Sequence, residues 1–247
     1  MGKYIKYAFG EIILVVIGIL IALQINNWNE DAKLRATEHT FLNRLQIDLK
    51  DNITNWNTII EREERFYEGA KAFIRLSLQK NKDSIMKIFP YVNPVGRWDD
   101  ITMNQVTFKE MQSSGQLDLI TNDSLKIKLM QLDHFYQKVF NRYESIKVGH
   151  FNNIGTPINE ALDFKLYILF DDTRKDLQPD DFTDEDLQKY FESYQNGLRS
   201  LLKNQSFTNG LTGRIFSYEL IIGELLDAKG QAQELIDLIE IELSAND

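Results

Sequence analysis

The chain has 247 residues, of which 43% are hydrophobic and 11% aromatic, so it can bury a packed core and is not a disordered chain. Its formal net charge of −9 argues against nucleic-acid binding, which needs a basic surface, and against an outer domain that lies flat on an anionic membrane. The absence of cysteine excludes disulfides, thiolate zinc sites and a cysteine nucleophile.

Residues 4–28 are typical of a membrane-spanning helix. A helix of this length, rising about 1.5 Å per residue, covers roughly 36 Å. That length fits a hydrocarbon core of about 30 Å with part of each interface. Tyr4, Tyr7 and Trp28 fall at the two ends, where aromatic rings anchor a helix. The apolar run ends without the small-residue cleavage site of a signal peptide, which favours an uncleaved anchor.

The charges that flank this segment predict its orientation. Lys3 and Lys6 precede it, whereas the far side opens with Glu30 and Asp31. The positive-inside rule therefore favours a cytoplasmic N-terminus. We expect a single-pass protein of the inner (cytoplasmic) membrane, embedded in the lipid bilayer, with the bulk of the chain in the periplasm.

One stripe of the membrane segment carries small residues and a single carboxylate. Spacings of three and four place five residues on it: Ala8, Glu11, Val15, Gly18 and Ala22. Small residues let helices approach closely, and a carboxylate in a membrane usually faces protein or water. The stripe is therefore predicted to dock on other membrane helices, by self-association or within a larger complex. Glu11 either snorkels or forms an ion pair near the cytoplasmic interface, or is a titratable or ion-binding site inside a helix bundle.

Helical spacing continues after the anchor. Residues 41–76 carry an apolar stripe with a polar gap around Glu63, which favours one long helix of a bundle over a coiled-coil stalk. The polar residues 26–38 form either continuous helix or a short hinge. Pro90, Pro94 and Gly96 predict a loop over residues 90–102.

The second half of the chain also reads as helical. Gly115 suits a helix C-terminus, and Asn122 or Asp123 an N-cap for a helix over residues 124–147. Residues 149–157 are expected to form a loop. Residues 161–170 suit a short helix or an extended piece. Thr183 begins a capping pattern for a helix reaching residue 203, and residues 207–243 form the last helix.

These elements predict an all-α fold: an N-terminal transmembrane helix followed by an extracytoplasmic helical bundle with long helices. The expected organisation is a transmembrane anchor over residues 1–28, a connector over residues 29–40 and a soluble helical-bundle domain over residues 41–247.

No pattern along the chain indicates catalysis. The histidines, His39, His134 and His150, are far apart, and His134 is expected to be structural or exposed. The acidic run of residues 171–186 lacks the alternating ligands and central glycine of an EF-hand. Phosphate-loop, dinucleotide-binding and nucleophile-elbow motifs are absent. We expect no catalytic residues, no metal and no cofactor.

Two segments resemble a known family. The stretch GEIILVVIGILIALQINNWNE at residues 10–30 is similar to the N-terminal signature of an uncharacterised, domain-of-unknown-function family of small single-pass membrane-anchored proteins of Bacteroidota. The stretch FKEMQSSGQLDLITNDSL at residues 108–125 resembles that family's inner motif. The resemblance implies a bacterial envelope protein with one N-terminal span, and implies no activity.

These inferences lead to one functional expectation and two alternatives. The first is a non-enzymatic envelope protein that serves as a structural, assembly or accessory subunit of a membrane protein complex. One alternative is a ligand-sensing ectodomain that signals through a partner. The other is a subunit of an ion- or proton-conducting assembly that uses Glu11.

Overall fold

The structure is a computed structural model that describes residues 2–79, 85–169, 177 and 183–245, with the side chains from residue 10 onward. The described residues are mostly helical and contain no strand, which confirms the all-α class. They divide into two compact units. Unit 1 comprises Met1–Asp51, Asn104–Gln131 and Gln233–Asp247, and unit 2 comprises Asn52–Met103 and Leu132–Ala232.

The first helix, α1 (Gly2–Ser77), is a single element of 76 residues. The alternative of a hinge over residues 26–38 is therefore wrong, because these residues are helical. Every residue from Gly10 to Ala36 is exposed, and burial begins at Thr37 and Glu38. The N-terminal part of α1 is thus a helix long and apolar enough to cross a membrane.

Unit 1 is held together by an apolar core and by two carboxylates of α1, one of them buried. The core takes residues from α1, α3 (Val106–Ser113), α4 (Asp123–His150) and α8 (Gln205–Ser244), including Leu42, Leu45, Met111, Leu125, Leu235 and Ile239. Glu38, only 1% exposed, accepts hydrogen bonds from the backbone N–H and the hydroxyl of Thr121, at 2.7 and 3.1 Å. Asp48 accepts from the backbone N–H of Thr107 at 2.9 Å. Thr107 and Thr121 lie at the two ends of the segment that contains α3 and η2 (Gln116–Leu119). The two carboxylates therefore attach both ends of this segment to α1.

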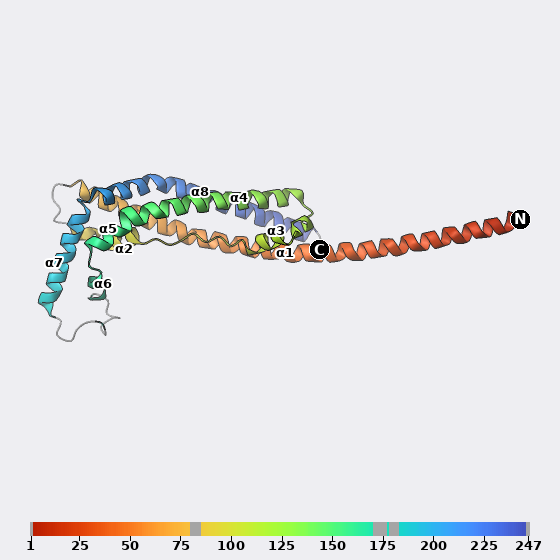
Figure 1. Cartoon of the computed structure of the whole chain (residues 1–247), viewed down its shortest axis with the longest axis horizontal. Helices are drawn as coiled ribbons and strands as arrows, with labels where there is room; N and C mark the ends of the chain where they lie inside the picture. The colour runs from red at the N-terminus through yellow and green to blue at the C-terminus, as the bar shows by residue number, and fades with distance from the viewer. Residues whose placement is uncertain (1, 80–84, 170–176, 178–182, 246–247) are drawn as a thin grey trace. The chain divides into compact units, whose positions relative to one another are not determined.

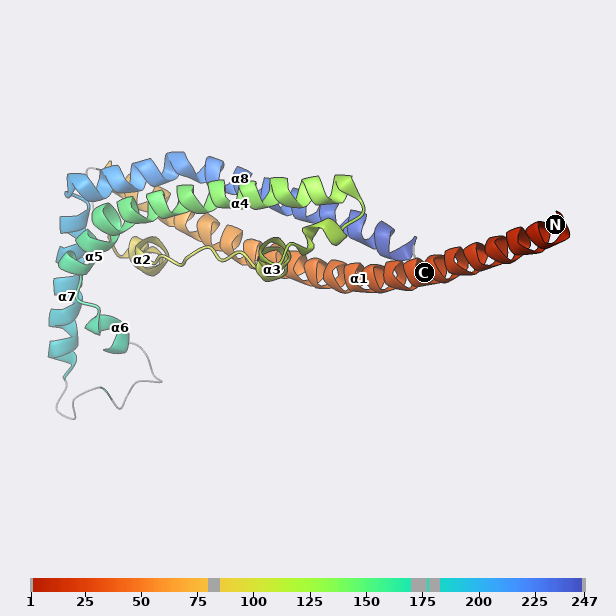
Figure 2. The same cartoon turned by 45° about the vertical axis from the view of Figure 1, so that its right-hand side comes forward.

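Unit 2 is a helical bundle with shorter helices packed at one end. Its parts of α1, α4 and α8 run side by side, and α7 (Asp184–Leu201) runs across their direction (Figures 1 and 2). The short elements are η1 (Ile85–Ile88), α2 (Phe89–Gly96), α5 (Thr156–Ala161) and α6 (Lys165–Leu169). They share one apolar core with α1, α7 and α8 that includes Phe73, Val92, Ile158, Leu166, Tyr194 and Phe207.

Two predicted loops are helical. The loop expected over residues 90–102 begins only after Gly96, because Pro90 lies in the first turn of α2, where its missing N–H costs nothing, and Val92 and Val95 are buried. The loop expected over residues 149–157 is also wrong. There α4 runs into a π-helical turn, η3 (Phe151–Gly155), and then into α5.

The predicted helix boundaries are confirmed at several caps. Gly115 follows α3 with φ 72°, the left-handed conformation that favours glycine. Asn122 accepts from the backbone N–H of Leu125 at 3.1 Å and caps α4. Thr183 and Asp186 form a complete capping box at the start of α7. Residues 165–169 form the short helix α6. Most of the acidic run, residues 171–176 and 178–182, lies outside the described residues.

Candidate functional site

The predicted docking stripe lies on the exposed part of α1. Glu11, Val15, Gly18 and Ala22 are all exposed. A Cβ added to Gly18 would meet no atom of the described chain within 4 Å. Trp28, a predicted interface anchor, is 64% exposed. The remaining predicted residues have side chains outside the described part: Lys3, Tyr4, Lys6, Tyr7 and Ala8. Docking through this stripe stays a prediction.

Sequence reasoning missed a buried polar centre in unit 2. Glu63, which looked like a polar gap in an apolar stripe, is 3% exposed, and Arg214 from α8 is 5% exposed. The Nη2 of Arg214 donates to Oε2 of Glu63 at 2.6 Å. The two charges compensate each other, as buried charges must.

Aromatic rings surround the guanidinium of Arg214. Its Cζ lies 4.5 Å from the ring centroid of Phe66 and 5.3 Å from that of Trp98. Both distances are within the range of cation–π attraction, which strengthens when the cation is desolvated. The rings restrict the movement of the side chain, so the direction of its N–H groups is set by packing as well as by the ion pair.

A second arginine extends this centre on α1. Arg62 donates to the hydroxyl of Tyr143 at 2.5 Å, and that hydroxyl donates to Oε1 of Glu63 at 2.9 Å. Burial raises the pKa of Tyr143, so the tyrosine is a neutral donor at physiological pH. Arg62 also pairs with the partly exposed Asp99 at 3.3 Å. The most buried charges of the centre are therefore two guanidinium groups and one carboxylate.

His150, at the end of α4, completes the centre. It is 1% exposed, and its ring centroid lies 5.0 Å from that of Trp98. Its Nε2 lies 3.3 Å from the carbonyl oxygen of Gly96 and must donate, because a carbonyl oxygen only accepts. Burial lowers the pKa of His150 to about 4, and the charge of Arg214 acts in the same direction. The imidazole is therefore neutral at physiological pH, and its Nδ1 carries a lone pair.

Three nitrogens of this centre lack hydrogen-bond partners within the described part of the chain. They are Nδ1 of His150 and the Nε and Nη1 of Arg214, all of them buried. Buried polar atoms are nearly always paired, because an unpaired one costs about 1–3 kcal/mol. The centre thus retains one acceptor and two donor groups for hydrogen bonds.

A polar cavity of about 370 Å³ has both His150 and Arg214 among the residues of its wall. The wall also contains amide and hydroxyl side chains from η3 and α8, those of Asn153, Ser206, Asn209 and Ser217. Among the described residues that line it, none carries a carboxylate. The cavity wall thus combines hydrogen-bonding side chains and one cation with three glycines and the aliphatic Ile146.

Glycines keep this cavity open. Gly149 and Gly213 line it, and a Cβ added to either would meet no described atom within 4 Å. Gly210 has a different role, because its Cβ would lie 2.8 Å from Cβ of Asn153. Because Gly210 has no Cβ, α8 can approach the π-helical turn η3 closely. Such turns are frequent at functional sites.

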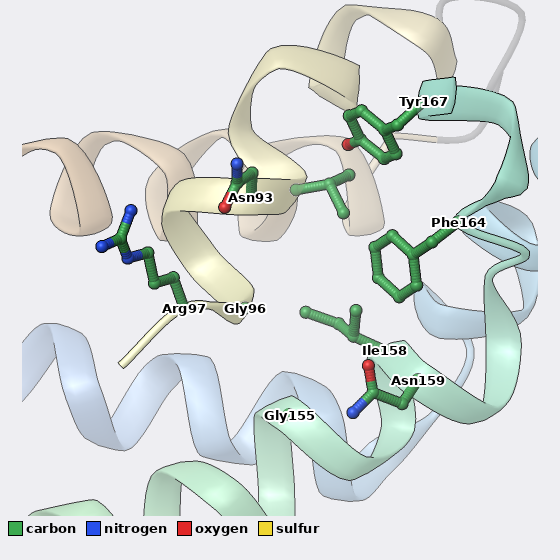
Figure 3. A pocket seen from close by; sticks show the side chains of 9 residues that line it. Asn93, Gly96, Arg97, Gly155, Ile158, Asn159, Phe164 and Tyr167 are labelled. Atoms are coloured by element: carbon green, nitrogen blue, oxygen red, sulfur yellow. The ribbon is translucent and has the colours of Figure 1, made fainter. Parts of the chain in front are cut away.

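A second cavity, of about 410 Å³, is lined by residues of α2, η3, α5 and α6 and includes Gly96 in its wall. Figure 3 shows Ile158 and Phe164 facing this hollow, with Tyr167 beside it and Asn93 on α2. Its wall is largely apolar, in contrast to that of the first cavity.

The described residues contain no group of three His, Asp or Glu side chains that could hold a metal ion. The centre is instead defined by one buried ion pair, a neutral histidine and a polar cavity. Sequence spacing gave no signal for it, because Glu63, His150 and Arg214 are separated by 87 and 64 residues. The polar gap at Glu63 in an otherwise apolar stripe is the only feature of the sequence that points to this centre.

The fold and this centre define an all-helical protein with an exposed apolar N-terminal helix and an arginine-containing polar cavity. The sequence pattern of DUF6090, a family of unknown function, matches residues 11–160, and the chain belongs to this family. The match includes Glu63 and His150 and ends before Arg214. Comparison with curated proteins gives no match, and neither does comparison with solved structures.

Proposed function

We propose that this protein is a non-enzymatic, membrane-anchored accessory subunit of a membrane protein complex in the bacterial envelope. The N-terminal part of α1 spans the inner membrane with its start in the cytoplasm, and the helical units work in the periplasm. The residues that resemble a Bacteroidota family support the envelope location. The single observation that carries the proposal is the complete exposure of residues 10–36 of α1.

Exposure on this scale requires a partner or a lipid environment. The segment contains Ile12, Ile13, Leu14, Val15, Val16, Ile17, Ile19, Leu20, Ile21, Leu23 and Ile25, each 48–74% exposed. Removing these side chains from water is worth on the order of 10 kcal/mol or more. A lipid bilayer provides this environment along the whole length of the helix.

The stripe supports the assembly part of the proposal. Bulky apolar side chains are stabilised about as well by contact with lipid as by contact with protein. Gly18 and Ala22, in contrast, allow another helix to approach the backbone. Glu11 shares their face, so a partner helix or trapped water would relieve the cost of its charge. Docking of this face on a second membrane helix is therefore the interaction that the segment favours.

Association in cells or in mild detergent tests the proposal. Gly18→Leu should weaken self-association or recovery of partners at least several-fold, because the leucine holds the helices apart. Gly10→Leu is a matched control, since Gly10 lies on the same helix about 100° away from the stripe. Equal association of both variants and the unmodified protein would rule out the stripe as the surface that docks on another helix.

Membrane topology needs a separate measurement. The full chain should stay in the membrane fraction after alkaline carbonate extraction. A protease added outside the cytoplasmic membrane should reach the region beyond residue 40. Release by carbonate, or protection of that region, would contradict the anchor or its orientation.

A further inference from the structure

We propose that a second copy of this chain docks in parallel on the side of α1 that faces away from the core of unit 1. The contact rests on the proposed membrane anchoring of α1 and extends it, because it names the partner and adds a surface beyond the apolar segment. This surface, called the outward line, consists of Ile25, Asn29, Ala32, Ala36, Thr40, Asn43 and Ile47.

The outward line lies opposite the packed side of α1. At 3.6 residues per turn, all its members fall within about 40° of Ala36 around the helix axis. The α1 residues that are buried in unit 1 include Leu42, Leu45 and Leu49. These leucines lie roughly 120–180° from Ala36 by the same geometry. A helix that docks on the outward line therefore does not compete with the core of unit 1.

The outward line is open over its whole length. The isoleucines at its two ends are 57% and 58% exposed, and the residues of the line between them are exposed as well. On one flank of α1, Arg44 donates to Glu110 of α3 at 3.2 Å. On the other flank, Gln46 donates to Glu240 of α8 at 2.8 Å. Both flanking residues lie about 80° from Ala36, so these contacts leave the line itself uncovered.

The distribution of charge makes the outward line complementary to a copy of itself. Within residues 25–47, the acidic and basic side chains all lie off the line, and they are Glu30, Asp31, Lys33, Arg35, Glu38 and Arg44. Like charges placed opposite each other are costly in an interface, so a face without charge meets its own copy without this repulsion. A partner recognised by ion pairs would instead need charged residues on the line.

The spacing of the line favours two parallel helices in register. Its first four residues follow alternating steps of four and three, as in the seam of a coiled coil. Two copies cross the membrane in the same direction, so Asn29 meets Asn29 of the other copy. An asparagine amide both donates and accepts hydrogen bonds, and one asparagine in such a seam sets the register of the pair. Ala32 and Ala36 let the two backbones approach closely.

Glu11 lies on the same side of α1 but far from this contact. It precedes Asn29 by 18 residues, which corresponds to about 27 Å along the helix. In a parallel pair the two Glu11 side chains lie near the cytoplasmic interface, where water reduces the cost of their charges. The outward line is thus independent of the state of Glu11.

Disulfide cross-linking tests the proposal, because the unmodified chain contains no cysteine. Asn29→Cys, Ala32→Cys and Ala36→Cys place single thiols on the outward line. Asn27→Cys and Leu34→Cys are the matched controls, since they lie about 160–180° from Ala36. All these positions are exposed, so the variants should fold.

The full-length variants are oxidised in membranes with copper phenanthroline. A disulfide needs two Cα atoms within roughly 7 Å, so the line positions should give roughly fivefold more covalent dimer than the controls. Equal yields on both sides of the helix, or no dimer at any position, would overturn the proposal.

Carbonate extraction of the same variants separates the two proposals. Variants that stay in the membrane but form no line-specific dimer would exclude a second copy as the partner, and would leave an accessory role with another membrane protein. Release by carbonate would overturn the anchor and the parallel pair together.

A pair of charged variants tests the contact without oxidation. Ala32→Glu combined with Ala36→Glu places like charges opposite each other, so the dimer fraction in mild detergent should fall roughly tenfold or more. The control, Asn27→Glu combined with Leu34→Glu, adds the same charge to the other side of the helix and should retain the dimer. Sedimentation velocity measures both. An undiminished dimer of the first variant would show that the membrane segment alone holds the copies together, against the proposal.

Discussion

Arg214 and Glu63, 151 residues apart, form a 2.6 Å ion pair in which both side chains are at most 6% exposed. The pair joins α8 to α1 inside unit 2. Two rings, a tyrosine hydroxyl and a neutral histidine surround it. Such a pair is sensitive to the loss of either partner, because the remaining charge is left in a site with little water.

Removal of one partner should therefore be strongly destabilising. We expect Glu63→Gln and Arg214→Met each to lower the free energy of unfolding by about 3–5 kcal/mol. The double variant should lose less than the sum of the two, because it leaves no unpaired charge. Thermal unfolding followed by circular dichroism measures this. Additive losses would show that the two residues do not interact as the structure describes.

The buried histidine predicts a specific dependence on pH. The pKa of His150 is about 4 in the folded protein, below its ordinary value of 6.5, so the unfolded chain takes up the proton first as the pH falls. The resulting loss of stability begins near pH 6.5 and reaches about 3 kcal/mol near pH 4. Above pH 6.5 the residue contributes no pH dependence.

A pair of histidine variants isolates this effect from the titration of carboxylates. His150→Gln retains a donor for the carbonyl oxygen of Gly96 and should flatten the stability profile between pH 6.5 and 4. His134→Gln is the control, because His134 lies on the same helix and is exposed. If the free energy of unfolding of the unmodified protein and of both variants changed with pH in the same way, a neutral, buried His150 would be contradicted.

Gly197 marks a close approach between α7 and the end of α5. A Cβ at this position would overlap the backbone carbonyl oxygen of Ala161 and would lie 2.9 Å from Leu162. Gly197→Ala should therefore destabilise the protein by about 1–3 kcal/mol, because a backbone atom cannot rotate away. Gly230→Ala, at an open position of α8, should instead be neutral or stabilise by up to about 1 kcal/mol. Similar unfolding temperatures for both variants would contradict this packing.

Local signals in the sequence predicted many of the helix boundaries. Thr183 with Asp186, Asn122 and Gly115 act within three residues along the chain, so their roles are readable without tertiary structure. Proline and glycine misled the prediction at residues 90–96 and 149–157. A helix can contain a proline in its first turn, or a glycine beside a neighbouring helix. Burial of its other side chains in the core then stabilises the helix.

The candidate cavity could not be predicted in the same way. Its wall combines His150 from α4, Asn153 from η3 and Arg214 from α8. The local sequence around His150 and Arg214 contains no motif that predicts a site. Their burial and their unpaired nitrogens exist only where the helices meet.

The sequence by itself determined the all-helical class, the apolar N-terminal helix and its stripe of small residues, since periodicity and caps are properties of neighbouring residues. Only the tertiary structure decided that Glu63 is a buried partner of Arg214 and that glycines hold open a polar cavity beside them. Those relationships depend on contacts between distant segments, which local spacing does not encode.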